Sequence, residues 1–213
     1  MSSEQILEIY NHLYRYFGPQ NWWPGETKLE ITVGAVLTQN TNWQNVEKAI
    51  TNLKMAGLLS LPSLSEIPAE ILAQQIKPSG YYNLKAKRLK NLISAIGQSD
   101  ADLENFLAAD LEALRDSLLA VKGIGPETAD SIILYAAEKP IFVIDAYTHR
   151  VLLRHNLIWE ESDYYEMQEL FMTSLPEEAE IYNEYHALLV RLGKEFCLKS
   201  NPKCESCPLQ IFL

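Results

Sequence analysis

The chain has 213 residues, 47% of them hydrophobic, and a formal net charge of −10 at pH 7. It is long and apolar enough for a real core, has no apolar run of about 18 residues, and does not begin with a basic segment followed by an apolar one. We therefore expect a cytoplasmic protein without a membrane span or signal peptide. The negative net charge argues against a protein whose whole surface binds nucleic acid.

Apolar residues recur at three- and four-residue spacing along almost the whole chain, and alternating β-branched stretches are scarce. This pattern predicts an all-α fold. The expected helices cover residues 3–17, 27–39, 42–56, 68–75, 83–98, 102–107, 110–121, 126–137, 143–155, 163–174 and 179–195. Proline and glycine separate these segments, and Pro62 and Pro68 mark a short connection.

Positive charge is concentrated in two stretches. One contains Lys77, Lys85, Lys87, Arg88 and Lys90, and the other contains Arg191, Lys194, Lys199 and Lys203. A DNA-binding surface needs only one positive face, so a negative net charge does not exclude it. The alternative is that both stretches are ordinary solvated helix faces.

A turn of sequence Gly123-Ile124-Gly125-Pro126 lies between two expected helices. The glycines permit backbone angles closed to other residues, and Pro126 suits the first turn of the second helix. Backbone N–H groups at such a turn can bind an anion such as a DNA phosphate, while Ile124 would enter the core. Gly123, Ile124, Gly125 and Thr128 are therefore candidate DNA contacts, although a plain helix corner uses the same glycines.

Asp145 directly follows the apolar run Ile141-Phe142-Val143-Ile144. A carboxylate beside an apolar run and shortly after a phosphate-binding turn is poorly explained by packing alone. It could also cap a helix that begins at Ala146, and the two roles are compatible. Asp145 is thus the first candidate for a catalytic group.

The segments KGIGPETADSIILYA and FVIDAYTHRV resemble the helix-hairpin-helix, Gly/Pro-rich loop and aspartate pattern of the endonuclease III (HhH-GPD) superfamily of DNA glycosylases. VGAVLTQNTNWQNVEKAI and SGYYNLKAKRLKNL are similar to earlier segments of that family, so the resemblance covers nearly the whole chain. It implies a two-lobed all-α fold. A six-helix barrel lobe would span residues 29–140, and the second lobe would combine 1–28 with 141–213.

The resemblance implies that Asp145 acts on a damaged nucleotide flipped out of duplex DNA. There a carboxylate can stabilise the oxocarbenium-like state at C1′ and orient water. Bifunctional members carry a lysine just after the hairpin that forms a Schiff base, but Glu127 occupies that position here. We therefore expect a monofunctional glycosylase, with Lys122 as an alternative amine. An endonuclease III-like lyase acting on oxidised pyrimidines and a non-catalytic DNA-binding module remain alternatives.

The resemblance also assigns DNA contacts. Gln39 matches the residue that fills the gap left by the flipped base, and Asn40 could hydrogen-bond the orphaned partner base. Lys85 and Lys87 would contribute to the positive face. The expected partner is damaged double-stranded DNA, bound by a monomer.

Three tryptophans, Trp22, Trp23 and Trp43, are candidate walls of the base pocket. Aromatic faces can select a cationic alkylated purine by stacking and cation–π attraction. The segment WWPGETKLEITVGAVLTQNTNW most resembles the 3-methyladenine branch of the superfamily. Packing in the hydrophobic core is the alternative role for each tryptophan.

The three cysteines of the chain form the pattern Cys197-x6-Cys204-x2-Cys207. Their number and position favour reduced thiols or a metal site over disulfides. Family members with a [4Fe–4S] cluster have a fourth cysteine, whose position falls on Leu213 here. A cluster with another ligand such as His186, zinc bound by three cysteines and a fourth group, and no metal all remain open. Any metal would be structural.

Overall fold

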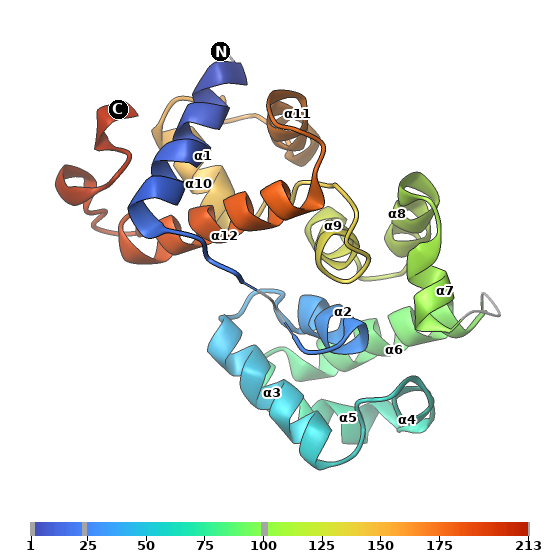
Figure 1. The fold of residues 1–213 in the computed structure, drawn as a ribbon. Coiled ribbons are helices and arrows are strands. Elements are labelled where there is room, and N and C mark those ends of the chain that lie inside the picture. The colour runs from blue at the N-terminus through green and yellow to red at the C-terminus, as the bar shows by residue number, and fades with distance from the viewer. Residues whose placement is uncertain (1–2, 23–24, 99–101, 213) are drawn as a thin grey trace. The chain divides into compact units, whose positions relative to one another are not determined.

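The computed structural model describes residues 3–22, 25–98 and 102–212 (Figure 1). Every regular element within these ranges is a helix, which confirms the predicted all-α class. The α-helices are α1 (Ser3–Phe17), α2 (Lys28–Leu37), α3 (Trp43–Met55), α4 (Leu61–Glu66), α5 (Ala69–Gln75), α6 (Tyr82–Gln98), α7 (Leu103–Ala108), α8 (Leu111–Leu119), α9 (Pro126–Tyr135), α10 (Ala146–Arg154), α11 (Tyr164–Ser174) and α12 (Ala179–Glu195). Short 3-10 helices are η1 (Lys77–Ser79), η2 (Cys204–Ser206) and η3 (Gln210–Phe212).

Two elements differ from the prediction. Helix α4 forms where only a connection was expected, because the Ser60 side chain accepts a hydrogen bond from the Ser63 amide and Pro62 fits the first turn. Helix α10 begins at Ala146 rather than at residue 143, because Asp145 is its extended N-cap. Both differences arise from capping at helix starts.

The chain forms two compact units. The hairpin unit comprises Trp23–Glu138, and the terminal unit combines Met1–Trp22 with Lys139–Leu213. The sequence predicted unit boundaries after residues 28 and 140, a few residues later than the boundaries of the structure, which follow Trp22 and Glu138.

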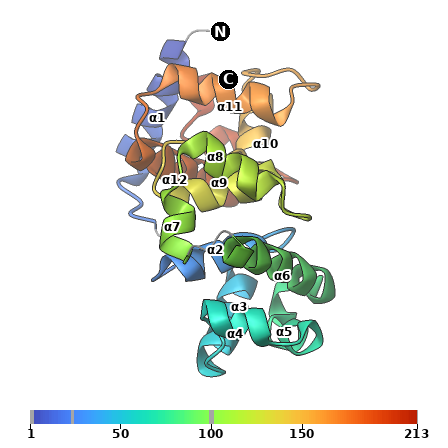
Figure 2. The same cartoon turned by 90° about the vertical axis from the view of Figure 1, so that its right-hand side faces the viewer.

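In the hairpin unit, α2 is the central helix, and it packs against α3, α6 and α9. Its sequence KLEITVGAVL is apolar on nearly all sides, as expected for a helix surrounded by others. Figure 2 shows α4 and α5 beside α6 in the same unit. The α8–α9 hairpin is joined by an ion pair in which Arg115 Nε lies 2.8 Å and Nη2 3.1 Å from the two carboxylate oxygens of Asp130.

This ion pair should be important for stability, since the side chains of Arg115 and Asp130 are only 19% and 0% exposed. We expect Arg115→Met to lower the free energy of unfolding by about 3 kcal/mol, because the buried carboxylate loses the arginine charge. Urea denaturation measures this. Lys28→Met is the control: it breaks the Lys28–Glu104 pair, whose side chains are 41% and 65% exposed, and should cost less than about 1 kcal/mol. Equal losses would contradict the prediction.

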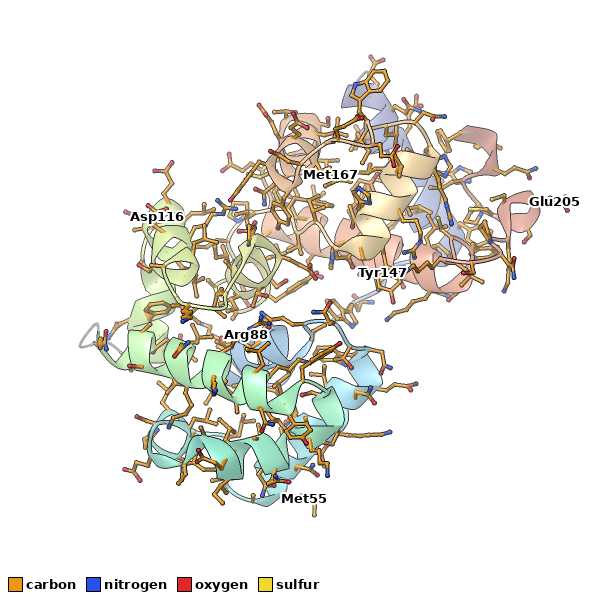
Figure 3. The ribbon with its side chains drawn as sticks, turned by 180° about the vertical axis from the view of Figure 1, so that it is seen from behind. Met55, Arg88, Asp116, Tyr147, Met167 and Glu205 are labelled. Carbon is orange, nitrogen blue, oxygen red and sulfur yellow. The ribbon has the colours of Figure 1, made fainter. Side chains whose placement is uncertain are left out.

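The terminal unit is built on α12, which packs against α10 and α1. Its core is aromatic: the rings of Phe142 and Phe171 stack with centroids 3.9 Å apart, and the Tyr185 hydroxyl donates to the Ile6 carbonyl. Helices α10 and α12 approach so closely that a Cβ at Gly193 would overlap the ring of Tyr147, which is labelled in Figure 3. This close packing fixes the start of α10 against α12.

Candidate active site

Asp145 ends the extended segment before α10 and caps that helix. Its Oδ1 accepts a hydrogen bond of 2.7 Å from the Thr148 amide, and its Oδ2 lies 3.6 Å from Nε2 of His186 on α12. The side chains of Asp145 and His186 are 14% and 7% exposed. The structure therefore gives the candidate catalytic carboxylate a buried imidazole neighbour.

Two opposing effects set the pKa of Asp145. Burial raises it, but the His186 side chain and the Thr148 amide lower it by more, so the pKa lies below its ordinary value. The carboxylate is consequently ionised at neutral pH. A negative charge held at a largely buried position is suited to stabilising a cationic transition state.

The segment before Asp145 is held by hydrogen bonds from α11. The Gln168 side-chain amide donates to the Phe142 carbonyl at 2.7 Å, and the Tyr164 hydroxyl accepts from the Ile144 amide at 3.4 Å. The side chains of residues 141–144 enter the core. The apolar run seen in the sequence thus anchors the carboxylate rather than extending α10.

The Gly-Ile-Gly turn lies between α8 and α9, as predicted. Gly123 has φ +99°, a backbone angle that favours glycine, and both glycines are exposed while Ile124 is buried. Glu127, at the position of the family lysine, is exposed in the first turn of α9. Lys122 is exposed on the other side of the turn.

Thr128 and Gln39 are hydrogen-bonded to each other, Thr128 buried and Gln39 half-buried. Thr128 is buried, and its Oγ1 accepts a hydrogen bond of 2.9 Å from Gln39 Nε2, while its role as a DNA contact stays a prediction. Gln39 Nε2 also donates to the Gly123 carbonyl at 3.2 Å. Asn40, which follows in the chain, is exposed and has φ +54°.

The basic stretch of α6 is largely internal. Lys85 is only 1% exposed, and its amine donates to the carbonyls of Leu37 and Ser79 at 2.8 and 2.6 Å. In this structure the amine of Lys85 therefore caps the ends of α2 and η1, and its role as a DNA contact stays a prediction. Lys90 likewise donates to three carbonyls at the end of α4, whereas Lys87 is exposed as expected.

Burial of Lys85 should make the free energy of unfolding depend on pH. Burial, together with the nearby Arg88, lowers the pKa of Lys85 to about 8. A lysine in an unfolded chain has a pKa of about 10.4, so between these values the unfolded state binds the extra proton and the free energy of unfolding rises with pH. Relative to Lys85→Met, the wild type should gain up to about 3 kcal/mol across this window. Denaturation at a series of pH values measures the difference, and parallel profiles would contradict it.

The two candidate tryptophans that the structure describes, Trp22 and Trp43, belong to different units. Trp22 lines a pocket of the terminal unit with Gln20 and with Ala187, Val190 and Lys194 of α12. Trp43 begins α3 in the hairpin unit, where its ring packs over Gly34 of α2. Trp23 lies outside the described residues. Trp43 therefore has a packing role, whereas Trp22 borders a surface pocket.

The cysteine tail does not fit a four-thiolate cluster. The sequence has only three cysteines, and no group of three His, Cys, Asp or Glu side chains in the described ranges could hold a metal ion. Cys197 is buried and accepts a hydrogen bond of 3.2 Å from Arg154, while His186 faces Asp145 instead. Leu213 lies outside the described residues.

Arginines of α10 hold this tail. Arg154 donates to the Leu198 and Lys199 carbonyls, and Arg150 donates to the Cys197 carbonyl at 2.7 Å. The tail is thus fastened to α10 by hydrogen bonds. Among the described residues, no helix is long and apolar enough to cross a membrane.

The sequence had suggested His186 only as a distant metal ligand and had counted Arg88 only as one charge of a basic stretch. Nothing local in the sequence shows that His186 meets Asp145, because the contact depends on how α10 and α12 pack. The same holds for Arg88, whose Nη1 donates to Gln39 Oε1.

Comparison with known proteins gives consistent similarities. Residues 33–177 match the family model described as HhH-GPD superfamily base excision DNA repair protein. A Methanocaldococcus jannaschii protein named as a DNA repair glycosylase is 47% identical over 98% of this chain and 96% of its own length. Endonuclease III of Sulfolobus acidocaldarius is 27% identical over 84% of this chain and 78% of its own length.

Two solved structures are similar in fold. The H. pylori 3-methyladenine DNA glycosylase MagIII, bound to 1,N6-ethenoadenine, has a TM-score of 0.79 and 33% identity, and the match covers 92% of this chain and 98% of that one. A trapped endonuclease III–DNA covalent intermediate has a TM-score of 0.84 at 21% identity, covering 100% and 95%.

Proposed function

Because the chain belongs to the HhH-GPD superfamily of base excision DNA repair proteins and is a DNA glycosylase, we propose that it is a monofunctional enzyme that excises an alkylated purine. The observation that carries this proposal is the ionised and largely buried carboxylate of Asp145. The proposed products are the free base and an intact strand with an abasic site.

The proposed mechanism follows from the charge of Asp145. As the N-glycosidic bond breaks, positive charge develops at C1′ of the flipped nucleotide, and a nearby carboxylate stabilises it and orients the attacking water. Thr148 holds one carboxylate oxygen through its amide. His186 lies beside the other oxygen and is proposed as a positioning residue, since an imidazole N–H can orient the carboxylate.

The absence of lyase chemistry is proposed from Glu127. A carboxylate cannot form the Schiff base that leads to strand cleavage. Glu127 is exposed at the start of α9, and Lys122 supplies the exposed amine of the adjoining turn. The proposed function therefore requires that Lys122 does not attack C1′.

The alkylated substrate is proposed from similarity and from chemistry. The relative MagIII is a 3-methyladenine DNA glycosylase, and its structure contains 1,N6-ethenoadenine. In this chain Trp22 borders a pocket, and an indole face favours an electron-poor or cationic purine. These observations support an alkylated purine over an oxidised pyrimidine.

The test is base release from a panel of duplexes. Each duplex carries one lesion: 3-methyladenine, 7-methylguanine, 1,N6-ethenoadenine, hypoxanthine, uracil or thymine glycol. We expect release of at least one alkylated purine and no strand cleavage before alkaline treatment. Release of thymine glycol alone would overturn the substrate assignment, and release of no base would overturn the proposed function.

A further inference from the structure

The side chain of Arg88 packs against the Gly-Ile-Gly turn at Gly123. It extends from α6 on the side of the hairpin (Figure 3), and a Cβ placed at Gly123 would lie 2.5 Å from Arg88 Cγ and 3.0 Å from Cδ. Carbon atoms do not approach so closely without a shift. Gly123 is therefore required by the aliphatic part of Arg88 as well as by its φ of +99°.

The guanidinium of Arg88 orients Gln39. Nη1 of Arg88 donates to Oε1 of Gln39, so the amide NH₂ group must point the other way. That NH₂ group donates to the Gly123 carbonyl and to Thr128 Oγ1. If the amide were flipped, its oxygen would face the Gly123 carbonyl, and two acceptors would oppose each other. Arg88 thus selects the orientation that binds the hairpin.

A second residue of α6 holds the turn directly. Asn91, one helical turn after Arg88, donates to the Lys122 carbonyl at 2.9 Å. The carbonyl oxygens of residues 122 and 123 are therefore both engaged by side-chain donors. A carbonyl that pointed outwards would repel an anionic phosphate at this surface, whereas the two exposed glycines leave the backbone accessible.

We propose that Arg88 is a positioning residue for the phosphate-binding turn and acts without contacting the phosphate itself. The aliphatic part of Arg88 contacts the turn at Gly123, and its guanidinium aligns Gln39 so that the Gly123 carbonyl stays bound to Gln39. This inference rests on the proposed function, since it assumes that the turn grips DNA. It differs from the role that the basic stretch suggested, which was direct attraction of DNA.

The test compares Arg88→Ala with Lys87→Ala, which removes the same charge from an exposed neighbour on the same helix. Binding to an undamaged duplex is measured at several salt concentrations. We expect Arg88→Ala to raise Kd about tenfold with an unchanged salt slope. Lys87→Ala should reduce the magnitude of the slope by about one, because an exposed amine on this face neutralises one phosphate. Arg88→Lys, which keeps a stem and a donor, should recover more of the affinity than Arg88→Met, which keeps a stem alone.

The coupling to Gly123 gives a second measurement. Gly123→Ala should raise Kd strongly in the wild type but less in the Arg88→Ala background, where the overlapping stem is absent. Thermal denaturation of each variant shows whether it is folded, and if Arg88→Ala is unfolded, Arg88→Met and Arg88→Lys decide the question. Arg88→Ala binding that equals the wild type, or a loss that reduces the salt slope, would overturn the positioning role. Failure of the wild type to release any base would instead overturn the proposed function.

Discussion

Replacing Asp145 by asparagine should lower the single-turnover rate of base excision on the order of 10³-fold, the loss expected when charge stabilisation of the transition state is removed. Asparagine is as good a helix N-cap as aspartate and nearly the same size, so α10 should still begin at Ala146. Binding to lesion DNA should therefore remain within a few fold of the wild type. Single-turnover base release and equilibrium binding measure the two effects separately.

The matched control for this change is Asp163→Asn. Asp163 caps α11 as Asp145 caps α10, but it lies in an exposed capping box. We expect Asp163→Asn to leave excision unchanged, which would show that loss of a capping charge is not what abolishes activity. If Asp145→Asn excised the base at the wild-type rate, the carboxylate would not be the catalytic group.

Borohydride trapping should give no covalent adduct between the wild-type protein and abasic DNA, and Glu127→Lys should create one. The substitution introduces an amine at the position where bifunctional members carry their lysine, and borohydride reduces a Schiff base to a stable link. The change from no adduct to a readily detected one should be visible as a band of retarded mobility in a denaturing gel.

Lys122→Gln is the control for the wild-type reaction. Lys122 is the exposed amine beside the hairpin turn, so any wild-type adduct should disappear in this variant. A wild-type adduct that Lys122→Gln abolishes would identify a bifunctional enzyme and refute the monofunctional proposal. Absence of an adduct in Glu127→Lys would show that position 127 does not approach C1′.

Local features of the fold followed from the sequence more reliably than contacts between distant segments. The hairpin turn was recognisable because glycine and proline determine backbone angles at fixed positions. The start of α10 was misplaced by three residues, since the apolar run 141–144 has no helical cap of its own and is anchored by Gln168 instead. Periodicity alone cannot distinguish a short extended apolar run from the first turn of a helix.

The candidate site was only partly predictable for a related reason. Asp145 stands out because its residue type is unusual beside an apolar run. His186 does not, because its contact with Asp145 depends on how α10 packs on α12. The internal position of Lys85 was not foreseen, because a basic stretch in a sequence does not show which amines will cap carbonyls inside the protein.

Several basic side chains of α6 form hydrogen bonds within the protein, and this affects how it binds undamaged DNA. Of the stretch from Lys77 to Lys90, the side chains of Lys85, Arg88 and Lys90 are engaged with the protein itself, while Lys77 and Lys87 are exposed. Few cations on this surface mean few counterions displaced per encounter, so residence on undamaged DNA should be short. The salt dependence of binding to undamaged DNA should accordingly be shallow, because its slope scales with the number of phosphates that the protein neutralises.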